Sequence, residues 1–283
     1  MIEFTSVSKR FGDGPLVIED FSLVIPAHKT TVLVGSSGCG KTTLLRMINR
    51  MVDPSSGTVE IDGTSVLERD PVALRRSIGY VLQSGGLLPH LRVVDNVATV
   101  PRLNGVSRAD ARARALELLD TVGLDRSLAS RYPAQLSGGQ QQRVGVARAL
   151  ASDPNILLMD EPFGAVDPIV RAELQQETIR LQRELDKTVV FVTHDIDEAF
   201  LLADQVVILE KGGRIVQKGS PSEIIENPAN DFVASFIGVD RGARALTIKQ
   251  TPHGRVLVDD AGRTQGVLVE ESAPARRSEG SLP

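Results

Sequence analysis

Hydrophobic and polar positions along the chain predict strands that alternate with helices. Beta-forming residues alternate or cluster in MIEFTSVSKRF (1–11) and LVIEDFSLVI (16–25), as expected for an antiparallel sheet at the start of the chain. Short apolar runs, typical of strands buried on both faces, predict the further strands KTTVLVG (29–35), TVEIDG (58–63), SIGYVLQ (77–83), NILLMD (155–160), TVVFVTH (188–194) and QVVILE (205–210).

Helical periodicity lies between these strands and dominates one long stretch. The sequences LLRMINRM (44–51) and RAELQQETIRLQREL (171–185) have apolar residues at helical spacing. From about residue 91 to residue 150 the pattern is helical, and Ser107 with Asp110 predicts a capping box. Strands that alternate with helices indicate a doubly wound α/β sheet, and we interpret residues 91–150 as a helical insert.

The last part of the chain has a different character. The sequence RVLVDDAGRTQGVLVEE (255–271) predicts two short strands around a glycine-containing turn. The sequence SAPARRSEGSLP (272–283) has the composition of a disordered tail. We therefore predict one large domain over residues 1–240, a short extension over residues 241–271, and a disordered tail.

Composition and charge exclude several classes of protein. The chain has 283 residues, of which 41% are hydrophobic and 24% are charged, as in ordinary globular proteins. A net charge of -4 and an aromatic content of 4% argue against a nucleic-acid partner. No apolar run is long enough to span a bilayer, and the first residues lack a signal-peptide core. We therefore expect a cytoplasmic protein whose membrane association, if any, comes through a partner.

A glycine-rich stretch after the third predicted strand carries the first candidate chemistry. The sequence GSSGCGKTT (35–43), here called the phosphate loop, contains G-x-x-x-x-G-K-[ST] between a predicted strand and a predicted helix. Its backbone N–H groups and the helix dipole would cradle phosphates. Lys41 would reach the β- and γ-phosphates of a nucleotide, and the Thr42 hydroxyl would coordinate Mg²⁺. The alternative is a glycine-rich turn with a chance lysine.

Every residue of the phosphate loop is a candidate to contact the nucleotide. The set comprises Gly35, Ser36, Ser37, Gly38, Cys39, Gly40, Lys41, Thr42 and Thr43. Cys39 is the one cysteine of the chain, which excludes an internal disulfide framework and a cysteine-based zinc cluster. Because Cys39 lies inside the loop, we expect bound ATP to protect its thiol from bulky alkylating reagents.

Polar residues at the ends of three other predicted strands are candidate partners of the phosphate loop. Asp160 ends an apolar strand, so its carboxylate is expected at the ligand-binding edge of the sheet, as a direct or indirect partner of Mg²⁺. Glu161 points differently and could accept a proton from the attacking water. Gln83 can hydrogen-bond water or Mg²⁺, and His194 can donate to a γ-phosphate. A surface glutamine and a capping histidine are the alternatives, but both residues end strands expected to terminate at this edge.

A second glycine-rich turn lies too far along the chain to belong to the phosphate loop. In LSGGQ (136–140), Ser137 is a plausible N-cap, and its hydroxyl with the N–H groups of Gly138 and Gly139 would form another anion cradle. One chain has one phosphate loop, so the second cradle has no phosphate of its own. Two copies that met head to tail would each offer LSGGQ to the nucleotide on the other copy.

Together these motifs resemble the ATP-binding subunits of ABC transporters. The resemblance covers residues 1–240 in the family's order: the phosphate loop, Gln83, LSGGQ, LLMDEP, a GAVD turn with Asp167, and VTHD. It implies the ABC type of P-loop NTPase fold, with a mixed, mainly parallel sheet, an antiparallel β subdomain at the N-terminus and a helical subdomain. It also implies nucleotide contacts by Gln140 and Asp167. Phe11 would stack on adenine, and a buried core phenylalanine is the alternative.

The resemblance implies an ATPase that drives transport. ATP and Mg²⁺ would be the cofactors, and two copies, or two paired ATPase subunits, would close around two ATP molecules. The partners would be integral-membrane permease subunits and, indirectly, a substrate-binding protein, which places the chain at the cytoplasmic face of the membrane. Gln83 and the loop SGGLLPHLR (84–92) are similar to the docking place of the permease, although an ordinary loop with a buried leucine pair is the alternative.

The finer sequence is similar to importers of quaternary amines, such as glycine betaine, carnitine or choline. NPANDFVASFIG (227–238) carries this similarity most clearly. Importers of amino acids, sulfonates or polyamines differ only by degree, and a non-transport ATPase of this family or a small-molecule kinase or GTPase is a further alternative. Relatives often carry a tandem pair of CBS regulatory modules after the ATPase. Because the residues after Gly238 are too few for two modules, we expect a stray hairpin or a dimer contact there.

Overall fold

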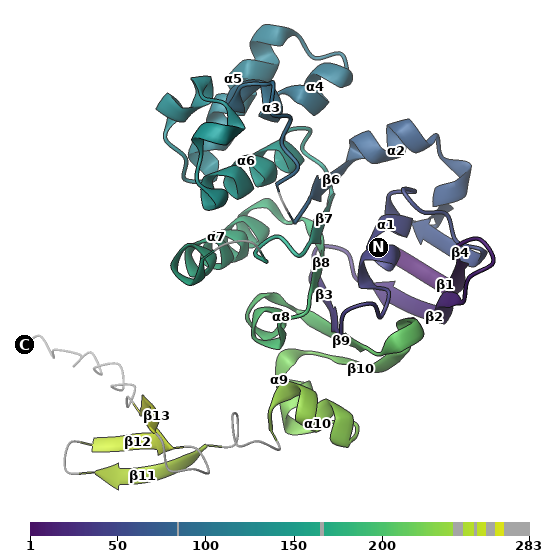
Figure 1. Cartoon of the computed structure of the whole chain (residues 1–283), viewed down its shortest axis with the longest axis vertical. Coiled ribbons are helices and arrows are strands. Elements are labelled where there is room, and N and C mark those ends of the chain that lie inside the picture. Colours follow the sequence, from purple (N-terminus) through teal and green to yellow (C-terminus); the bar gives the residue numbers. More distant parts are fainter. Residues whose placement is uncertain (84, 165–166, 240–245, 252–253, 259–263, 269–283) are drawn as a thin grey trace, which may run out of the picture. The chain divides into compact units, whose positions relative to one another are not determined.

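The computed structural model describes residues 1–83, 85–164, 167–239, 246–251, 254–258 and 264–268 (Figure 1). The chain forms two compact units, Met1–Ala229 and Asn230–Pro283. None of the helices described combines the length and the apolar character that a membrane crossing requires.

An antiparallel sheet forms one layer of the larger unit. Its strand order is β2-β1-β4-β5, and the strands are β1 (Ile2–Arg10), β2 (Leu16–Ile25), β4 (Ser56–Ile61) and β5 (Thr64–Ser65). Phe4 and Phe21 pack edge to face in its core, with ring centroids 5.3 Å apart. The antiparallel sheet expected at the N-terminus is thus confirmed, and the strand expected at residues 58–63 joins it as β4.

The second layer is a six-stranded sheet with the order β10-β9-β3-β8-β7-β6. Its strands are β3 (Thr30–Gly35), β6 (Ile78–Val81), β7 (Ile156–Asp160), β8 (Thr188–Thr193), β9 (Gln205–Leu209) and β10 (Ile215–Gly219). All neighbours pair in parallel except β9 and β10, which are antiparallel. The carboxyl ends of β3, β6, β7 and β8 therefore meet at one edge of the sheet, where open α/β sheets bind their ligands.

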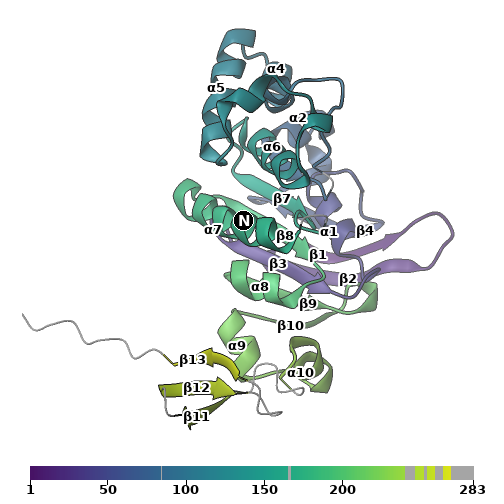
Figure 2. The same ribbon diagram turned by 60° about the vertical axis from the view of Figure 1, so that its left-hand side comes forward.

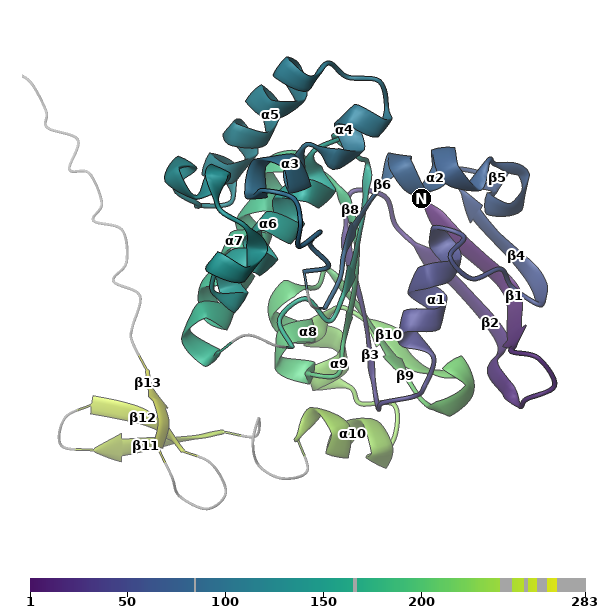
Figure 3. The same cartoon turned by 45° about the horizontal axis from the view of Figure 1, so that its top comes forward.

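Helices cover both faces of the six-stranded sheet (Figure 3). Helix α1 contacts β4 as well as β3, β7 and β8, so it lies between the two sheets, whereas α8 contacts β3 and β8 from the other face. The helices of this unit are α1 (Lys41–Ile48), α2 (Pro71–Ser77), α3 (Val93–Val97), α4 (Thr99–Leu103), α5 (Arg108–Thr121), α6 (Gly138–Leu150), α7 (Pro168–Leu185), α8 (Ile196–Leu202) and α9 (Pro221–Glu226). Short 3₁₀ turns lie at Val66–Glu68, Arg126–Ser130, Pro133–Gln135 and Lys211–Gly213.

The segment expected to be helical, residues 91–150, contains the group α3 to α6 seen at the top of Figure 2. Helices α3, α5 and α6 contact one another, and the buried Leu118 and Val144 belong to their shared core. Ser107 caps α5 as expected, since its Oγ accepts the N–H of Asp110 at 3.1 Å. These helices hold the sequence LSGGQ at the start of α6.

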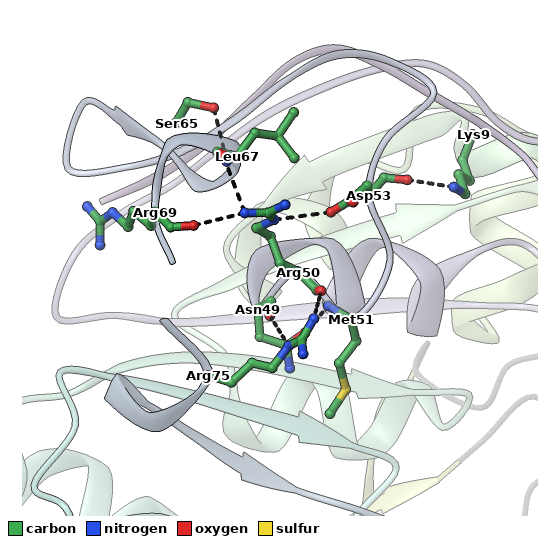
Figure 4. A network of polar contacts seen from close by, with 9 residues as sticks. All are labelled: Lys9, Asn49, Arg50, Met51, Asp53, Ser65, Leu67, Arg69 and Arg75. Atoms are coloured by element: carbon green, nitrogen blue, oxygen red, sulfur yellow. Dashed lines mark hydrogen bonds and ion pairs between the residues drawn. The ribbon is translucent and has the colours of Figure 1, made fainter. Parts of the chain in front are cut away.

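Arginine side chains tie the carbonyl end of α1 to its neighbours (Figure 4). Arg50 donates to the carbonyl oxygen of Arg69 at 2.8 Å and to Asp53 Oδ1 at 3.2 Å. Arg75 of α2 donates to the carbonyl oxygens of Asn49, at 3.3 Å, and of Arg50. Because α1 starts at the phosphate loop and α2 leads into β6, this network connects two elements that carry the site.

The described residues of the smaller unit form one helix and a three-stranded antiparallel sheet. These elements are α10 (Asp231–Ile237), β11 (Thr247–Thr251), β12 (Gly254–Val258) and β13 (Thr264–Val267), with the order β11-β12-β13. Strands β12 and β13 confirm the two strands expected within residues 255–271. Strand β11 was not expected, because its exposed sequence TIKQT has no apolar run. The turn at 259–263 and the expected tail at 272–283 lie outside the described residues.

Candidate functional site

The phosphate loop joins β3 to α1, as the sequence predicts. Gly40 caps α1 with a φ of 107°, a backbone conformation in which a side chain is strained, so glycine is favoured at this residue. The N-terminus of α1 directs backbone N–H groups and its positive dipole end toward a pocket of about 220 Å³. The described residues that line this pocket are Val17, Ser37, Gly38, Gly40, Lys41, Thr42, Thr43 and Glu161.

Lys41 places its ammonium group inside the curve of the phosphate loop. Its Nζ donates to the carbonyl oxygens of Gly35 at 2.7 Å and of Ser36 at 3.0 Å, and the residue is buried. A cation held in this position, next to the N–H groups at the start of α1, makes the loop strongly attractive to an anion.

The Cys39 thiol does not face the pocket, which corrects the expectation of ATP-protectable labelling. Cys39 is only 1% exposed and belongs to the hydrophobic core that packs around α1. Its Sγ lies 3.1 Å from the position that a Cβ on Gly35 would occupy, beneath the loop. A bulky reagent cannot reach this thiol with or without ATP, so only the backbone of Cys39 is available to a nucleotide.

Asp160 and Thr42 meet although 118 residues separate them. Thr42 Oγ1 donates to Asp160 Oδ1 at 2.8 Å. The other carboxylate oxygen, Oδ2, accepts the Tyr80 hydroxyl at 3.1 Å and lies 3.5 Å from Arg46 Nη2. The buried carboxylate is therefore paired with a cation and hydrogen-bonded on both oxygens, as a buried charge requires.

The sequence analysis missed Tyr80 and Arg46. Burial is the main reason that the pKa of Tyr80 is raised to about 12. The Asp160 charge acts in the same direction, and Arg46 acts against it. The hydroxyl therefore stays protonated at neutral pH and can donate to Asp160. Two signals could have found these residues: Arg46 lies four residues after Thr42, on the same face of a helix, and a buried tyrosine hydroxyl needs a partner.

Glu161 lies at the meeting point of three strand ends. Its φ of 45° is unusual for a residue with a side chain and turns the carboxylate away from that of Asp160. Its Oε2 lies 3.2 Å from His194 Nδ1 and accepts Gln83 Nε2 at 3.4 Å. The structure thus brings Gln83 and His194 to the same edge of the sheet, as expected, and joins both to the carboxylate next to the phosphate loop.

Phe11 lies in the turn after β1 and is 51% exposed, so the alternative of a buried core phenylalanine is wrong. Lys9 Nζ lies 4.9 Å from the centroid of the Phe11 ring. The same ammonium donates to the carbonyl oxygen of Asp53 at 2.6 Å. An exposed aromatic ring held in this way can stack on a flat ligand.

The sequence LSGGQ forms the first turn of α6. Ser137 caps the helix in a reciprocal capping box: its Oγ accepts the N–H of Gln140 at 3.2 Å, and Gln140 Oε1 accepts the N–H of Ser137 at 3.0 Å. Gly138 and Gly139 are the first helical residues, and Ser137 and Gly138 are exposed. Within the described residues, this turn contributes nothing to the lining of the phosphate-loop pocket of its own chain.

Asp167 caps α7, because its Oδ1 accepts the N–H of Val170 at 3.1 Å. The two preceding residues of the GAVD turn, 165–166, lie outside the described residues. The structure places Asp167 at a helix start, and its expected contact with nucleotide stays a prediction.

The loop after Gln83 is held by α6 and has an exposed leucine next to a partly exposed one. Arg148 donates to the carbonyl oxygens of Gly85 at 2.9 Å and of Gly86 at 2.6 Å. Leu88 is 37% exposed and Leu87 is partly exposed, so the alternative of a buried leucine pair is wrong. Ser84 lies outside the described residues.

Comparisons with known proteins agree with this arrangement. The family model of the ABC transporter matches residues 18–164. The chain is 52% identical to the glycine betaine/carnitine/choline transport ATP-binding protein OpuCA of Bacillus subtilis, over 85% of this chain and 63% of that protein. It is 50% identical to the glycine betaine uptake system ATP-binding protein YehX of Escherichia coli, over 88% of this chain and 80% of that protein. The chain thus spans less than two thirds of the length of OpuCA.

A solved structure supports the same assignment. The dimeric post-hydrolysis state of the ATP-binding cassette MJ0796, bound to ADP and phosphate, is 35% identical with a TM-score of 0.71, over 78% of this chain and 99% of that one. A TM-score of 0.71 at 35% identity shows that the two chains share their fold over this part. The sequence match, the fold and the order of the motifs agree, and the chain belongs to the ABC transporter family of ATP-binding proteins.

Proposed function

We propose that this chain is the ATP-hydrolysing subunit of an importer, and that the solute is a quaternary-amine osmoprotectant such as glycine betaine, carnitine or choline. The observation that carries the proposal is the convergence of Lys41, Asp160, Glu161 and His194 at one sheet edge. The chain that contains this cluster is about 50% identical to ATP-binding proteins of such transport systems.

The phosphate loop would bind ATP, and Glu161 would act as the general base. Lys41 and the N–H groups at the start of α1 offer positive charge to the phosphates. The Glu161 carboxylate lines the same pocket and would accept the proton of a water that attacks the γ-phosphorus. In the tautomer protonated on Nδ1, His194 donates to Glu161 and fixes its orientation, while Gln83 donates to the same oxygen. Phe11 would stack on the adenine.

Thr42, Asp160 and Gln83 fit a Mg²⁺ ion. The Thr42 hydroxyl and Asp160 Oδ1 already lie 2.8 Å apart, and Mg²⁺ prefers oxygen ligands of this type. The Gln83 side chain, which contacts Glu161 at the same edge of the sheet, would add a neutral amide oxygen. A bound Mg²⁺ would neutralise charge that develops on the phosphates.

The second half of each nucleotide site would come from another copy of the chain. Ser137 and Gly138 are exposed at the start of α6, where helix N–H groups point outward. With Gly139 and Gln140 they would contact the phosphates of the nucleotide on the partner copy, and Asp167 would lie at the same interface. A dimeric ABC cassette is known among the similar solved structures. ATP bound at both shared sites would make the closed dimer more stable than the separated copies.

The remaining partners follow from the proposed role in import. Residues 85–92 present the exposed Leu88 and the partly exposed Leu87 on a loop held by α6, and this loop would contact an integral-membrane permease. A substrate-binding protein would act indirectly, through the permease. The chain would then work at the cytoplasmic face of the membrane, with residues 1–240 as its ATPase domain and residues 241–271 as an extension.

Uptake measurements would test the solute. In a strain that lacks the gene, we expect uptake of radiolabelled glycine betaine, carnitine or choline under osmotic stress to fall, and the intact gene to restore it. A Glu161→Gln gene should produce the protein without restoring uptake. Unchanged uptake of these amines with lost uptake of an amino acid, a polyamine or a sulfonate would favour the alternative importers. Unchanged uptake of every solute would favour a non-transport ATPase.

A further inference from the structure

The two oxygens of the Asp160 carboxylate have different partners. Oδ1 accepts only the Thr42 hydroxyl among the hydrogen bonds described for it, at 2.8 Å. Oδ2 accepts the Tyr80 hydroxyl at 3.1 Å and pairs with Arg46 Nη2 at 3.5 Å. One oxygen thus faces the proposed Mg²⁺ ligand Thr42, while the other is held by side chains that do not line the phosphate-loop pocket.

The holding groups come from two rigid elements. Tyr80 lies on β6, opposite Leu158 of the neighbouring β7, so the register of the sheet sets its position. Arg46 lies one helical turn after Thr42 on α1, so both side chains lie on the same face of that helix. Both groups contact the same carboxylate oxygen, Asp160 Oδ2, so they act on it together.

A carboxylate that binds a metal through one oxygen needs its other oxygen fixed. Without a partner on Oδ2, the carboxylate could rotate and carry Oδ1 away from Thr42. Residues that hydrogen-bond to a metal ligand, without touching the metal themselves, change the affinity for the metal. Tyr80 can fix the orientation because its hydroxyl is a neutral donor that adds no charge. Arg46 offsets part of the cost of keeping the buried carboxylate ionised.

We propose that Tyr80 and Arg46 are positioning residues for the divalent cation: they hold Asp160 Oδ2 so that Oδ1 stays aligned with the Thr42 hydroxyl. This inference rests on the function proposed above. Tyr80 fixes the orientation of the Asp160 carboxylate, and the positive charge of Arg46 helps to keep that carboxylate ionised.

The test separates metal affinity from nucleotide affinity in the full-length chain. Tyr80→Phe removes one hydroxyl and keeps the ring. With a non-hydrolysable ATP analogue present, we expect the Kd for Mn²⁺, measured by electron paramagnetic resonance, to rise about tenfold, as one hydrogen bond to a charged group can produce. The Kd for the analogue in EDTA should not change, because the phosphate loop does not contact Tyr80.

Matched variants control for structural damage. Tyr132→Phe removes the hydroxyl of the other tyrosine of the chain, which is partly exposed and lies outside the pocket, and should change neither constant. Arg46→Lys keeps the positive charge and should weaken Mn²⁺ binding less than Arg46→Met. Thermal unfolding by circular dichroism would verify that each variant is folded.

Each of the following results would overturn the inference. An unchanged Kd for Mn²⁺ in Tyr80→Phe would show that the hydroxyl does not orient Asp160. An equal loss of metal-free nucleotide binding would show general damage to the site, and an equal effect of Arg46→Lys and Arg46→Met would remove the role of charge. A wild-type chain that binds the analogue in EDTA but no Mn²⁺ would refute this inference alone, whereas a wild-type chain that binds no nucleotide would refute the proposed function as well.

Discussion

The Nδ1 atom of His194 lies 3.2 Å from Oε2 of Glu161, at the ends of two neighbouring parallel strands. The backbone N–H of Glu161 also donates to the carbonyl oxygen of Val192 at 3.0 Å. The backbone of Glu161 is therefore bonded to β8, the strand that His194 follows. A displacement of His194 would therefore move the proposed base relative to the phosphate loop.

Replacing Glu161 with glutamine tests the proposed base. Glu161→Gln keeps the shape of the side chain and one acceptor oxygen but cannot accept the proton of the attacking water. We expect ATP hydrolysis to slow by about 10²- to 10⁴-fold, the usual contribution of a general base. ATP should then hold two copies together, which size-exclusion chromatography with ATP would detect. A fully active variant that stays monomeric with ATP would contradict the role of Glu161.

Ser137→Arg tests the shared nucleotide site. A long cationic side chain at the exposed start of α6 would block the close approach of a second copy. We expect binding of ATP to the single chain to be retained, and both dimerisation with ATP and hydrolysis to be lost. Ser130→Arg, at an exposed serine of the same helical group, is the matched control and should dimerise normally. Lost binding of ATP to the single Ser137→Arg chain would count against the two-copy model.

The burial of Cys39 predicts a slow reaction with thiol reagents. Because the thiol is 1% exposed and lies in the core, we expect a bulky reagent such as dithiobis(nitrobenzoate) to react only when the chain opens. The rate should be low without ATP and should rise with urea as the chain unfolds. Fast labelling of the folded chain that ATP then blocks would show instead that the thiol faces the nucleotide.

Glu198 predicts a pH dependence of stability. Burial raises the pKa of its carboxyl above the ordinary value of 4.5, although Thr193 Oγ1 donates to Oε2 at 2.7 Å and Gln175 Nε2 donates to Oε1 at 3.3 Å. The folded chain therefore binds this proton more tightly than the unfolded chain. The contribution is fully present below the unfolded pKa and is lost as pH rises through the folded pKa.

Glu198→Gln removes this titration while it keeps the size of the side chain. Relative to wild type, we expect the free energy of unfolding of the variant to increase as pH rises above about 4.5 and then to level off beyond the folded pKa. Urea unfolding at a series of pH values would measure this difference. A difference that stays constant across the series would show that Glu198 has the same pKa in both states.

Local patterns were sufficient for most elements and several site residues, but not for all of them. The buried strands and the phosphate loop were recognised because apolar runs and the pattern of Gly35, Gly40, Lys41 and Thr42 are signals within a few residues. Strand β11 gave no such signal, because it is mostly exposed and has Ile248 as its one apolar residue. Its place in a sheet depends on pairing with β12.

The orientation of single side chains was harder to predict. Cys39 was expected to face ATP because it lies within the loop, but the backbone turns its thiol into the core. Phe11 could equally have been buried or exposed, since a lone aromatic residue after a strand is compatible with both. The spacing of Arg46 from Thr42 and the need of the Tyr80 hydroxyl for a partner single out these residues, but their shared contact with Asp160 depends on β6 and α1 lying beside β7, which no local pattern specifies.

The amino-acid pattern was enough to predict the P-loop class of the chain, the alternation of strands and helices, and four candidate residues: Lys41, Asp160, Glu161 and His194. Spacing and residue chemistry are local, so they can be recognised along the chain. The folded structure was needed to show which carboxylate oxygen of Asp160 faces Thr42 and which is held by Tyr80 and Arg46. Those contacts join residues far apart in the chain, and they exist only because parallel strands end at one edge above a single helix.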